Sequence, residues 1–247
     1  MVIRDVTVMY KQSVLGFAWA FINPVFSMVV FSIVFGKLAN IQSDNIPYPI
    51  FSYAALIPWT YFSTALTASS NSLIGNSSIF TKVYFPRLII PLTPILSKLA
   101  DFSISFILLV ALMIYYHYYP TLKIFLLPLV ILIMMVTAIG LGTFFSALAL
   151  QYRDIRFAIT FLMPLLLYAA PVVFPASLIK EKFGNTAYSL YGLYPMTGVI
   201  EGFRAAVVTT KPIPWNLIGM SAIGAILFFL LGMYTFKSME NKFADVA

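Results

Sequence analysis

The side chains that could do chemistry in this 247-residue chain are few and far apart. One histidine, His117, stands among tyrosines, and two oppositely charged pairs, Lys98 with Asp101 and Glu201 with Arg204, are each three residues apart. Side chains at that spacing share a helix face, so each pair can form an ion pair. Neither an H-E-x-x-H motif nor a close pair of carboxylates occurs. The sequence therefore predicts no metal site and no acid/base catalytic site.

Groups that bind nucleotides or react as thiols are also missing from the sequence. The Gly-Lys pair Gly36-Lys37 has Phe31 where the first glycine of a phosphate-binding loop would stand. The absence of cysteine excludes disulfides, cysteine-ligated zinc and a thiol nucleophile. We expect this chain to bind no cofactor by itself.

The composition indicates an integral membrane protein. Hydrophobic residues make up 61% of the chain and charged residues 9%, against about 45–50% and about 25% in a soluble domain. Too few polar side chains are present to cover a surface that faces water. A soluble enzyme, a disordered protein and a nucleic-acid-binding domain are excluded, and the net charge of +7 is scattered rather than clustered.

Stretches without Asp, Glu, Lys or Arg locate the helices that must position these few groups, because a charge at mid-bilayer is costly. A helix needs about 20 residues to cross the hydrocarbon core. We predict an all-α fold with six spans, at about 14–37, 49–73, 93–116, 123–149, 157–175 and 214–236. The charge-free stretch 183–200 is short and rich in glycine, so we expect it to be broken or re-entrant.

Six spans place both ends of the chain on one side of the membrane. With that side in the cytoplasm, nine of the fifteen basic residues lie inside, as the positive-inside rule prefers. Residues 1–13 are amphipathic at helical period and predict a helix at the membrane interface. Such a helix could act as a lever on a partner or as a simple anchor. Residues 237–247 form the predicted cytoplasmic tail.

Two short inner loops carry the next candidates. In 75–92, Asn76 or a following serine can cap a short surface helix, and Pro86 forces a turn before the third span. Tyr84 and Phe85 are either interfacial anchors or a knob presented to a cytoplasmic protein. The loop 151–154 is tight, and Arg153 in it and Arg156 just after it could serve only to set the topology.

The segment 176–213 is the only long outer one, with four prolines in or beside it and a predicted helix at 196–208. Non-helical backbone at membrane depth needs protein or water around it. This segment is therefore our candidate for an extracellular gate, the alternative being an exposed amphipathic hairpin without a gating role.

Aromatic residues are abundant, with 23 Phe, 15 Tyr and 3 Trp. Many belong to interfacial belts, but some could line a pore and offer flat faces to sugar rings. The candidates for that lining are Trp19, Phe26, Trp59, Tyr61 and Phe62. Asp101 is the one acid near the core of a span, so ion-coupled transport is poorly supported. These features favour a transport subunit driven by a separate ATPase.

Several motifs together resemble the membrane subunit of type-2 ABC exporters, in particular the permeases for O-antigen and teichoic-acid polysaccharides. The matching segments are Arg4-Asp5 with Tyr10-Lys11-Gln12, Lys82 to Leu88, Tyr152-Arg153-Asp154-Ile155, and Tyr194-Pro195-Met196 followed by Ile200 to Arg204. Two departures stand out. The family usually carries a further stretch before Arg4, so we expect this chain to begin late, and its Asn-Pro-Met is Tyr194-Pro195-Met196 here.

The resemblance implies two copies of this chain around a channel, two ATPase subunits on the cytoplasmic side, and a lipid-linked glycan as cargo. ATP and Mg would bind the ATPase. The residues implied in coupling to the ATPase are Arg4, Asp5, Lys11, Lys82, Tyr84, Phe85, Pro86, Arg87, Tyr152, Arg153 and Asp154. The residues implied at the outer gate are Pro195, Met196, Glu201 and Arg204. The location implied is the cytoplasmic membrane of a prokaryote.

Two other functions stay open at this point. One is a type-2 permease for a drug or a small lipid. The other is a membrane-embedded glycosyl- or acyltransferase, for which only Asp101, Glu201 and His117 are eligible as catalytic groups.

Overall fold

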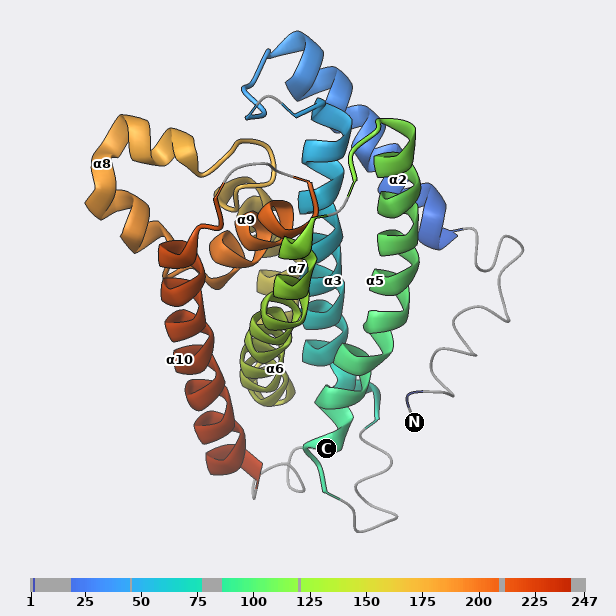
Figure 1. Ribbon diagram of the computed structural model, residues 1–247. Helices are drawn as coiled ribbons and strands as arrows, with labels where there is room; N and C mark the ends of the chain where they lie inside the picture. The colour runs from blue at the N-terminus through green and yellow to red at the C-terminus, as the bar shows by residue number, and fades with distance from the viewer. Residues whose placement is uncertain are drawn as a thin grey trace.

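The computed structural model describes residues 2, 19–44, 46–76, 86–119, 121–208 and 212–240. Within these ranges the chain is built from helices and contains no strand, which confirms the all-α prediction (Figure 1). The elements are α2 (Trp19–Phe31), a π-helix η2 (Ser32–Leu38), α3 (Tyr48–Gly75), α5 (Ile89–Tyr115), a 3₁₀-helix η3 (Leu122–Leu126), α6 (Leu127–Gln151), α7 (Asp154–Ala169), α8 (Ser177–Tyr191), α9 (Pro195–Val207) and α10 (Trp215–Met239).

Four stretches among the described residues are long and apolar enough to cross a membrane. They are Phe21–Leu38, Ile89–Tyr115, Leu122–Gln151 and Trp215–Met239. In hydrocarbon only a helix satisfies every backbone N–H and C=O within one segment, so apolar runs of this length fold as helices. The predicted count of six spans includes two further helices, of which α3 is more polar and α7 is shorter than these four.

Helix α3 is long enough to span but more polar, because protein rather than lipid surrounds most of it. Its 28 residues make it ~42 Å long, and it contacts α2, α5, α6, α7 and α9. Two of its tyrosines donate hydrogen bonds to α5, Tyr53 to the Ser105 carbonyl (3.1 Å) and Tyr61 to the Ile95 carbonyl (3.1 Å). Helix α3 is thus the centre of the bundle.

Helix α7 has only 16 residues, or ~24 Å, short of the ~30 Å hydrocarbon core. It ends at Ala169, before the predicted limit of 175, because Pro171 disfavours helical backbone at Ala170, where ψ is 152°. Ile159 and Met163 are its buried residues. Most of α7 therefore faces away from the bundle of this one chain.

Glycines bring α10 close to α6 and α9. A Cβ atom on Gly140 would lie 2.5 Å from the Phe229 amide nitrogen, and one on Gly232 would collide with the Gly140 carbonyl. On the other side of α10, the Gly198 N–H donates to Ser221 Oγ (2.9 Å). Small residues let membrane helices approach with their backbones in contact, and here they fix α10 against the core.

The segment between α7 and α10 divides into two unlike helices. Every residue of α9 except Glu201 is buried, whereas none of α8 is. Helix α8 also contains Gly184 at φ +83°, so two helical pieces meet there at an angle. Figure 1 shows both helices at the end of the bundle where α3 begins. The alternative prediction for 176–213, an exposed amphipathic hairpin, therefore fits the exposure of α8 but not the burial of α9.

Candidate functional site

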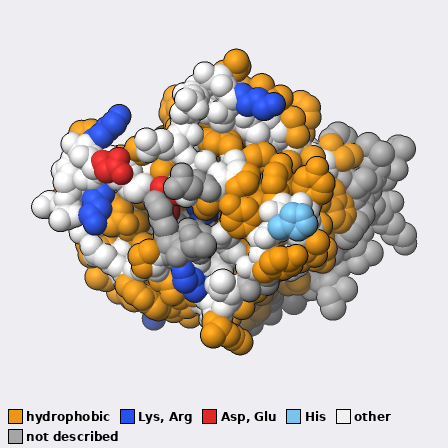
Figure 2. Space-filling view, turned by 45° about the horizontal axis from the view of Figure 1, so that its top comes forward, with side chains coloured by type: hydrophobic (Ala, Val, Ile, Leu, Met, Phe, Trp, Pro, Cys, Tyr) orange, Lys and Arg blue, Asp and Glu red, His pale blue; other side chains and the backbone are white. Residues whose placement is uncertain are grey.

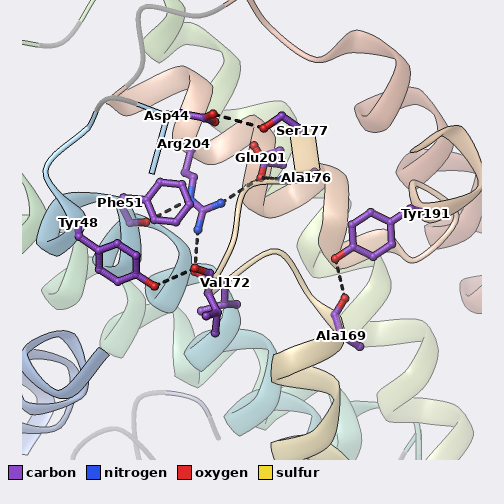
Figure 3. Close-up of polar contacts among 11 residues, drawn as sticks. Asp44, Tyr48, Phe51, Ala169, Val172, Ala176, Ser177, Tyr191, Glu201 and Arg204 are labelled. Atoms are coloured by element: carbon purple, nitrogen blue, oxygen red, sulfur yellow. Dashed lines mark hydrogen bonds and ion pairs between the residues drawn. The ribbon is translucent and has the colours of Figure 1, made fainter. Parts of the chain in front are cut away.

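Arg204 is the centre of a buried polar cluster at the end of the bundle that carries α8 and α9, here called the Arg204 end (Figure 3). Its guanidinium donates three hydrogen bonds: to Glu201 Oε1 (3.0 Å), to the Phe51 carbonyl (3.1 Å) and to the Val172 carbonyl (2.8 Å). The guanidinium carbon also lies 3.6 Å from the centre of the Phe51 ring. One side chain of α9 thereby holds α3 and the segment after α7 together. We call Arg204 and Glu201 with these acceptors the clasp.

Glu201 completes the clasp from the preceding turn of α9. Its Oε1 atom accepts a hydrogen bond from the Ala176 N–H (2.9 Å) as well as from Arg204. Burial raises the pKa of the Glu201 carboxyl, and the Arg204 guanidinium and the Ala176 N–H oppose that shift because they favour the carboxylate. A buried carboxylate that is paired in this way neutralises Arg204 and holds 170–176 in place.

Further side chains bind the same segment. Tyr48 donates to the Val173 carbonyl (2.8 Å), and Tyr191 donates to the Ala169 carbonyl (2.6 Å). Ser177 Oγ lies 3.3 Å from Asp44 Oδ1. The last carbonyls of a helix lack partners within the helix, and Tyr191 at the end of α8 supplies one for Ala169. Tyr48 of α3 and Arg204 of α9 bind the carbonyls of Val173 and Val172, which follow α7 directly. The end of α7 is consequently fixed to three other elements.

The four predicted gate residues lie at this end, and three are fully buried. Pro195 is the first residue of α9, and Met196 and Arg204 pack inside beside it. Figure 2 looks onto this end: charged side chains gather over α8, and the histidine stands in an apolar area. His117 is exposed at the turn after α5, with φ at +59°.

The opposite end, here called the Arg156 end, carries the described coupling residues. Pro86, Tyr152, Arg153 and Asp154 are exposed and Arg87 is half-buried. Arg87 donates to the Glu240 carbonyl at the end of α10. Arg156 Nε donates to Asn71 Oδ1 on α3 (2.8 Å). Beneath them Leu73, Ile90, Ala147 and Phe236 form a small apolar core.

Six predicted coupling residues lie outside the described part of the chain. They are Arg4, Asp5, Lys11, Lys82, Tyr84 and Phe85. The predicted interface helix 1–13 and most of the predicted coupling segment therefore stay predictions. In the described part, Arg153 and Asp154 form no ion pair with each other, and Asp154 stands in the first turn of α7, where a negative charge is favourable.

The predicted aromatic lining falls mostly in the core of this chain. Trp59, Tyr61 and Phe62 are buried in α3. Phe26 on α2 is 69% exposed, and the side chain of Trp19 lies outside the description. Phe26 is thus the one predicted lining residue that has an exposed side chain in the described part of the chain.

The candidate catalytic groups do not form a site within the described residues. Asp101 pairs with Lys98 (2.8 Å), Glu201 pairs with Arg204, and no group of three His, Cys, Asp or Glu residues could hold a metal ion there. Both carboxylates are neutralised by a cation on their own helix. The arrangement suits the holding of helices rather than acid/base chemistry.

The sequence matches the family model described as ABC-2 type transporter over residues 1–208. It is 28% identical over 244 residues to the O-antigen export system permease protein RfbA of Myxococcus xanthus, covering 98% of this chain and 92% of that protein. RfbA of Klebsiella pneumoniae is 25% identical with the same coverage. The polysialic acid transport protein KpsM of Escherichia coli is 21% identical over 94% of this chain and 90% of its own length.

Proposed function

This chain belongs to the ABC-2 type transporter family, and from that premise we propose that it is the permease subunit of an exporter that moves a lipid-linked polysaccharide of the O-antigen or teichoic-acid kind outward across the cytoplasmic membrane. The observation that carries this proposal is the similarity to export permeases over 98% of the chain. Those relatives are named for O-antigen export and for polysialic acid transport, which are both polysaccharide cargoes.

The energy comes from a partner in this proposal. The sequence holds no phosphate-binding loop, and the transporter family works with an ATPase, so ATP and Mg bind that second protein, in two copies. The Arg156 end is the proposed cytoplasmic face, and both termini are proposed to be cytoplasmic. Its exposed Pro86, Tyr152, Arg153 and Asp154, together with Lys82, Tyr84, Phe85 and the segment 1–13, would receive the ATPase.

A second copy of the chain completes the proposed path. The side chains of Phe157, Phe161, Leu165 and Tyr168 recur every three or four residues along α7 and are all exposed. An apolar helix face of this kind needs lipid or protein to cover it. We place α7 beside its counterpart in the second copy, with α8 and α9 closing the outer end as a gate.

Reconstitution of the chain with its own ATPase in proteoliposomes tests the function. We expect glycan to cross the membrane only with ATP, and an ATPase variant that binds but does not hydrolyse ATP should block export. Export of a drug or a small lipid without glycan export would instead favour the other kind of type-2 permease. Nucleotide hydrolysis by the purified chain alone would contradict the proposal.

Deletion of 76–87 tests the coupling segment in the same vesicles. The expected result is loss of ATP-driven export while the isolated ATPase keeps its hydrolytic activity. Wild-type export by the deletion variant would overturn the assignment of this segment.

A further inference from the structure

One face of α3 is polar and open although most of the other residues of this helix are buried. Thr60 and Thr64 are exposed, and Ser63, Thr67 and Asn71 are half-buried. Ser63 and Thr64 both lie three or four residues from Thr60 and from Thr67, and Asn71 follows Thr67 by four, so the five residues share one face of the helix. We call them the polar track. It covers the half of α3 that leads toward the Arg156 end.

Hydroxyl groups in membrane helices usually bond to their own backbone, and the track does so in part. Ser63 Oγ donates to the Thr60 carbonyl (3.2 Å), and Thr64 Oγ1 donates to the same carbonyl (2.7 Å). A hydroxyl that donates once still has lone pairs that accept, and it can rotate to another partner. The track can therefore exchange hydrogen bonds with a passing polar ligand.

The outward face of α5 shows what this chain presents to lipid. Leu96, Ile107, Val110 and Ile114 are exposed there, and Ser103, whose hydroxyl donates to the Leu99 carbonyl, is the one exposed hydroxyl between Leu96 and Ile114. Polar groups placed against hydrocarbon lose the hydrogen bonds that water would provide. A single hydroxyl among aliphatic side chains on α5 contrasts with five adjacent polar side chains on α3, and this contrast favours a polar space rather than lipid beside the track.

The Lys98–Asp101 pair lies at the depth of the track. Tyr61, next to Thr60, reaches the Ile95 carbonyl and packs its ring against Phe102 at 5.8 Å between centroids. These two contacts bracket 98–101 along α5. At about 100° per residue, Lys98 and Asp101 lie on the side of α5 away from Leu96 and Ile107.

This pair is also unusual for its position within the membrane helices. Lys98 is ~14 Å from the start of α5. The other charged side chains in the four apolar spans, Lys37, Lys123 and Lys237, stand within a turn of a span end. Ionisable groups at such depth generally face a cavity or a pathway.

The other border of the track is α7. Asn71, at the end of the track, accepts the hydrogen bond from Arg156, and exposed Thr160 follows one turn along α7. Figure 1 shows α3 between α5 and α7. Polar groups thus run from Lys98 and Asp101, over α3, to the first turns of α7.

We propose that the polar track is a glycan-binding surface whose Ser, Thr and Asn side chains exchange hydrogen bonds with the hydroxyl groups of the moving sugar chain. This deepens the proposed function and rests on it. Serine and threonine both donate and accept, as sugar hydroxyls do. Many weak contacts suit a path along which cargo must bind and also leave. The buried Trp59, Tyr61 and Phe62 support this surface from behind.

Cysteine labelling tests whether the track faces water, and it needs no cargo. The chain has no native cysteine, so Thr60→Cys and Thr64→Cys can each be compared with Ile107→Cys in the complete transporter, with and without ATP. The cysteine thiolate, which forms in water and not in lipid, attacks a charged methanethiosulfonate reagent and displaces methanesulfinate to form a mixed disulfide. We expect the reagent to label Thr60→Cys and Thr64→Cys at least ~10-fold faster than Ile107→Cys. Equal rates for Thr64→Cys and Ile107→Cys in both conditions would overturn the proposal.

A transport measurement tests the glycan itself. The triple variant Thr60→Val, Thr64→Val, Thr67→Val keeps side-chain shape and removes three hydroxyls. We expect a rise of about fivefold or more in the glycan concentration for half-maximal export, equivalent to about 1 kcal/mol. The control is Ser103→Ala, an exposed hydroxyl on α5 that bonds to the Leu99 carbonyl (2.8 Å).

The outcomes of this measurement separate the two proposals. Unchanged export by the triple variant, beside normal export by wild type, would overturn the track as a glycan surface. Absence of glycan export by the wild-type transporter would instead refute the proposed function, while the labelling result would still report which face meets water.

Discussion

Two ion pairs of equal spacing have opposite surroundings in this molecule. Glu201 and Arg204 lie 3.0 Å apart with side chains 15% and 3% exposed, and Lys98 and Asp101 lie 2.8 Å apart with side chains 19% and 32% exposed. Arg204 also donates hydrogen bonds to the carbonyls of Phe51 and Val172. Spacing creates both pairs, but backbone acceptors from distant segments turn only the first into a structural clasp. The second pair stays more exposed.

Arg204→Met should produce the largest loss of stability. Removal of the guanidinium leaves the Glu201 carboxylate and two carbonyls buried without their partner, which typically costs about 3–5 kcal/mol. Unfolding by denaturant in detergent, followed by intrinsic fluorescence, measures the change in the free energy of unfolding. If the free energy of unfolding changed by less than about 1 kcal/mol, the Glu201–Arg204 pair would contribute no more to stability than an exposed pair such as Lys98–Asp101.

The double variant Arg204→Met, Glu201→Leu sharpens this test. Replacement of a whole buried pair by apolar residues is often neutral, so much of the loss should be recovered. The recovery should be incomplete, because the Phe51 and Val172 carbonyls still lack the donor that Arg204 provided. If the double variant lost as much stability as Arg204→Met, those two carbonyls, and not the buried charge of Glu201 left without Arg204, would account for most of the loss.

Tyr48→Phe should have an intermediate effect at the same end. The change removes the single hydrogen bond to the Val173 carbonyl, which is worth about 0.5–1.5 kcal/mol. The same unfolding experiment measures this loss of stability. The matched control is Tyr234→Phe, because the side chain of Tyr234 on α10 is exposed. A loss as large as that of Arg204→Met would mean that the tyrosine, and not the ion pair, holds the segment after α7.

Lys98→Met should have the smallest effect on stability and a clear effect on export. A partly exposed pair contributes about 0–1 kcal/mol, so unfolding in detergent should change little. In vesicles the variant leaves Asp101 without its helix partner beside the polar track, and export should fall severalfold. If Lys98→Met lost as much stability as Arg204→Met, the two ion pairs would not differ in their structural role. Unchanged export by Lys98→Met would count against a role of this pair in the glycan path.

The sequence predicted the elements that depend on local pattern. Charge-free runs located α5, α6 and α10, and Pro195 marked the start of α9 within one residue of the predicted 196. The three-residue spacing predicted the Lys98–Asp101 pair, and it placed Glu201 and Arg204 on one face. These features depend on helical period and on the cost of charge in lipid, and both can be read from neighbouring residues.

The choice among similar side chains could not be read in this way. Helix α3 carries polar residues on several faces, and Ser69 and Ser70 are buried while Thr60 and Thr64 are exposed. Trp59, Tyr61 and Phe62 were equally plausible as lining residues before their burial was known. A helical pattern shows which residues share a face but not which neighbour covers that face.

By itself the sequence determined an all-helical membrane protein, because composition and short-range spacing decide those properties. Only the tertiary structure decided the role of Arg204, whose acceptor on Phe51 lies 153 residues away, and the exposure of the polar track. Hydrogen bonds between distant segments depend on how the helices cross. Burial on α3 depends on which helices pack around it, and no local pattern encodes that arrangement.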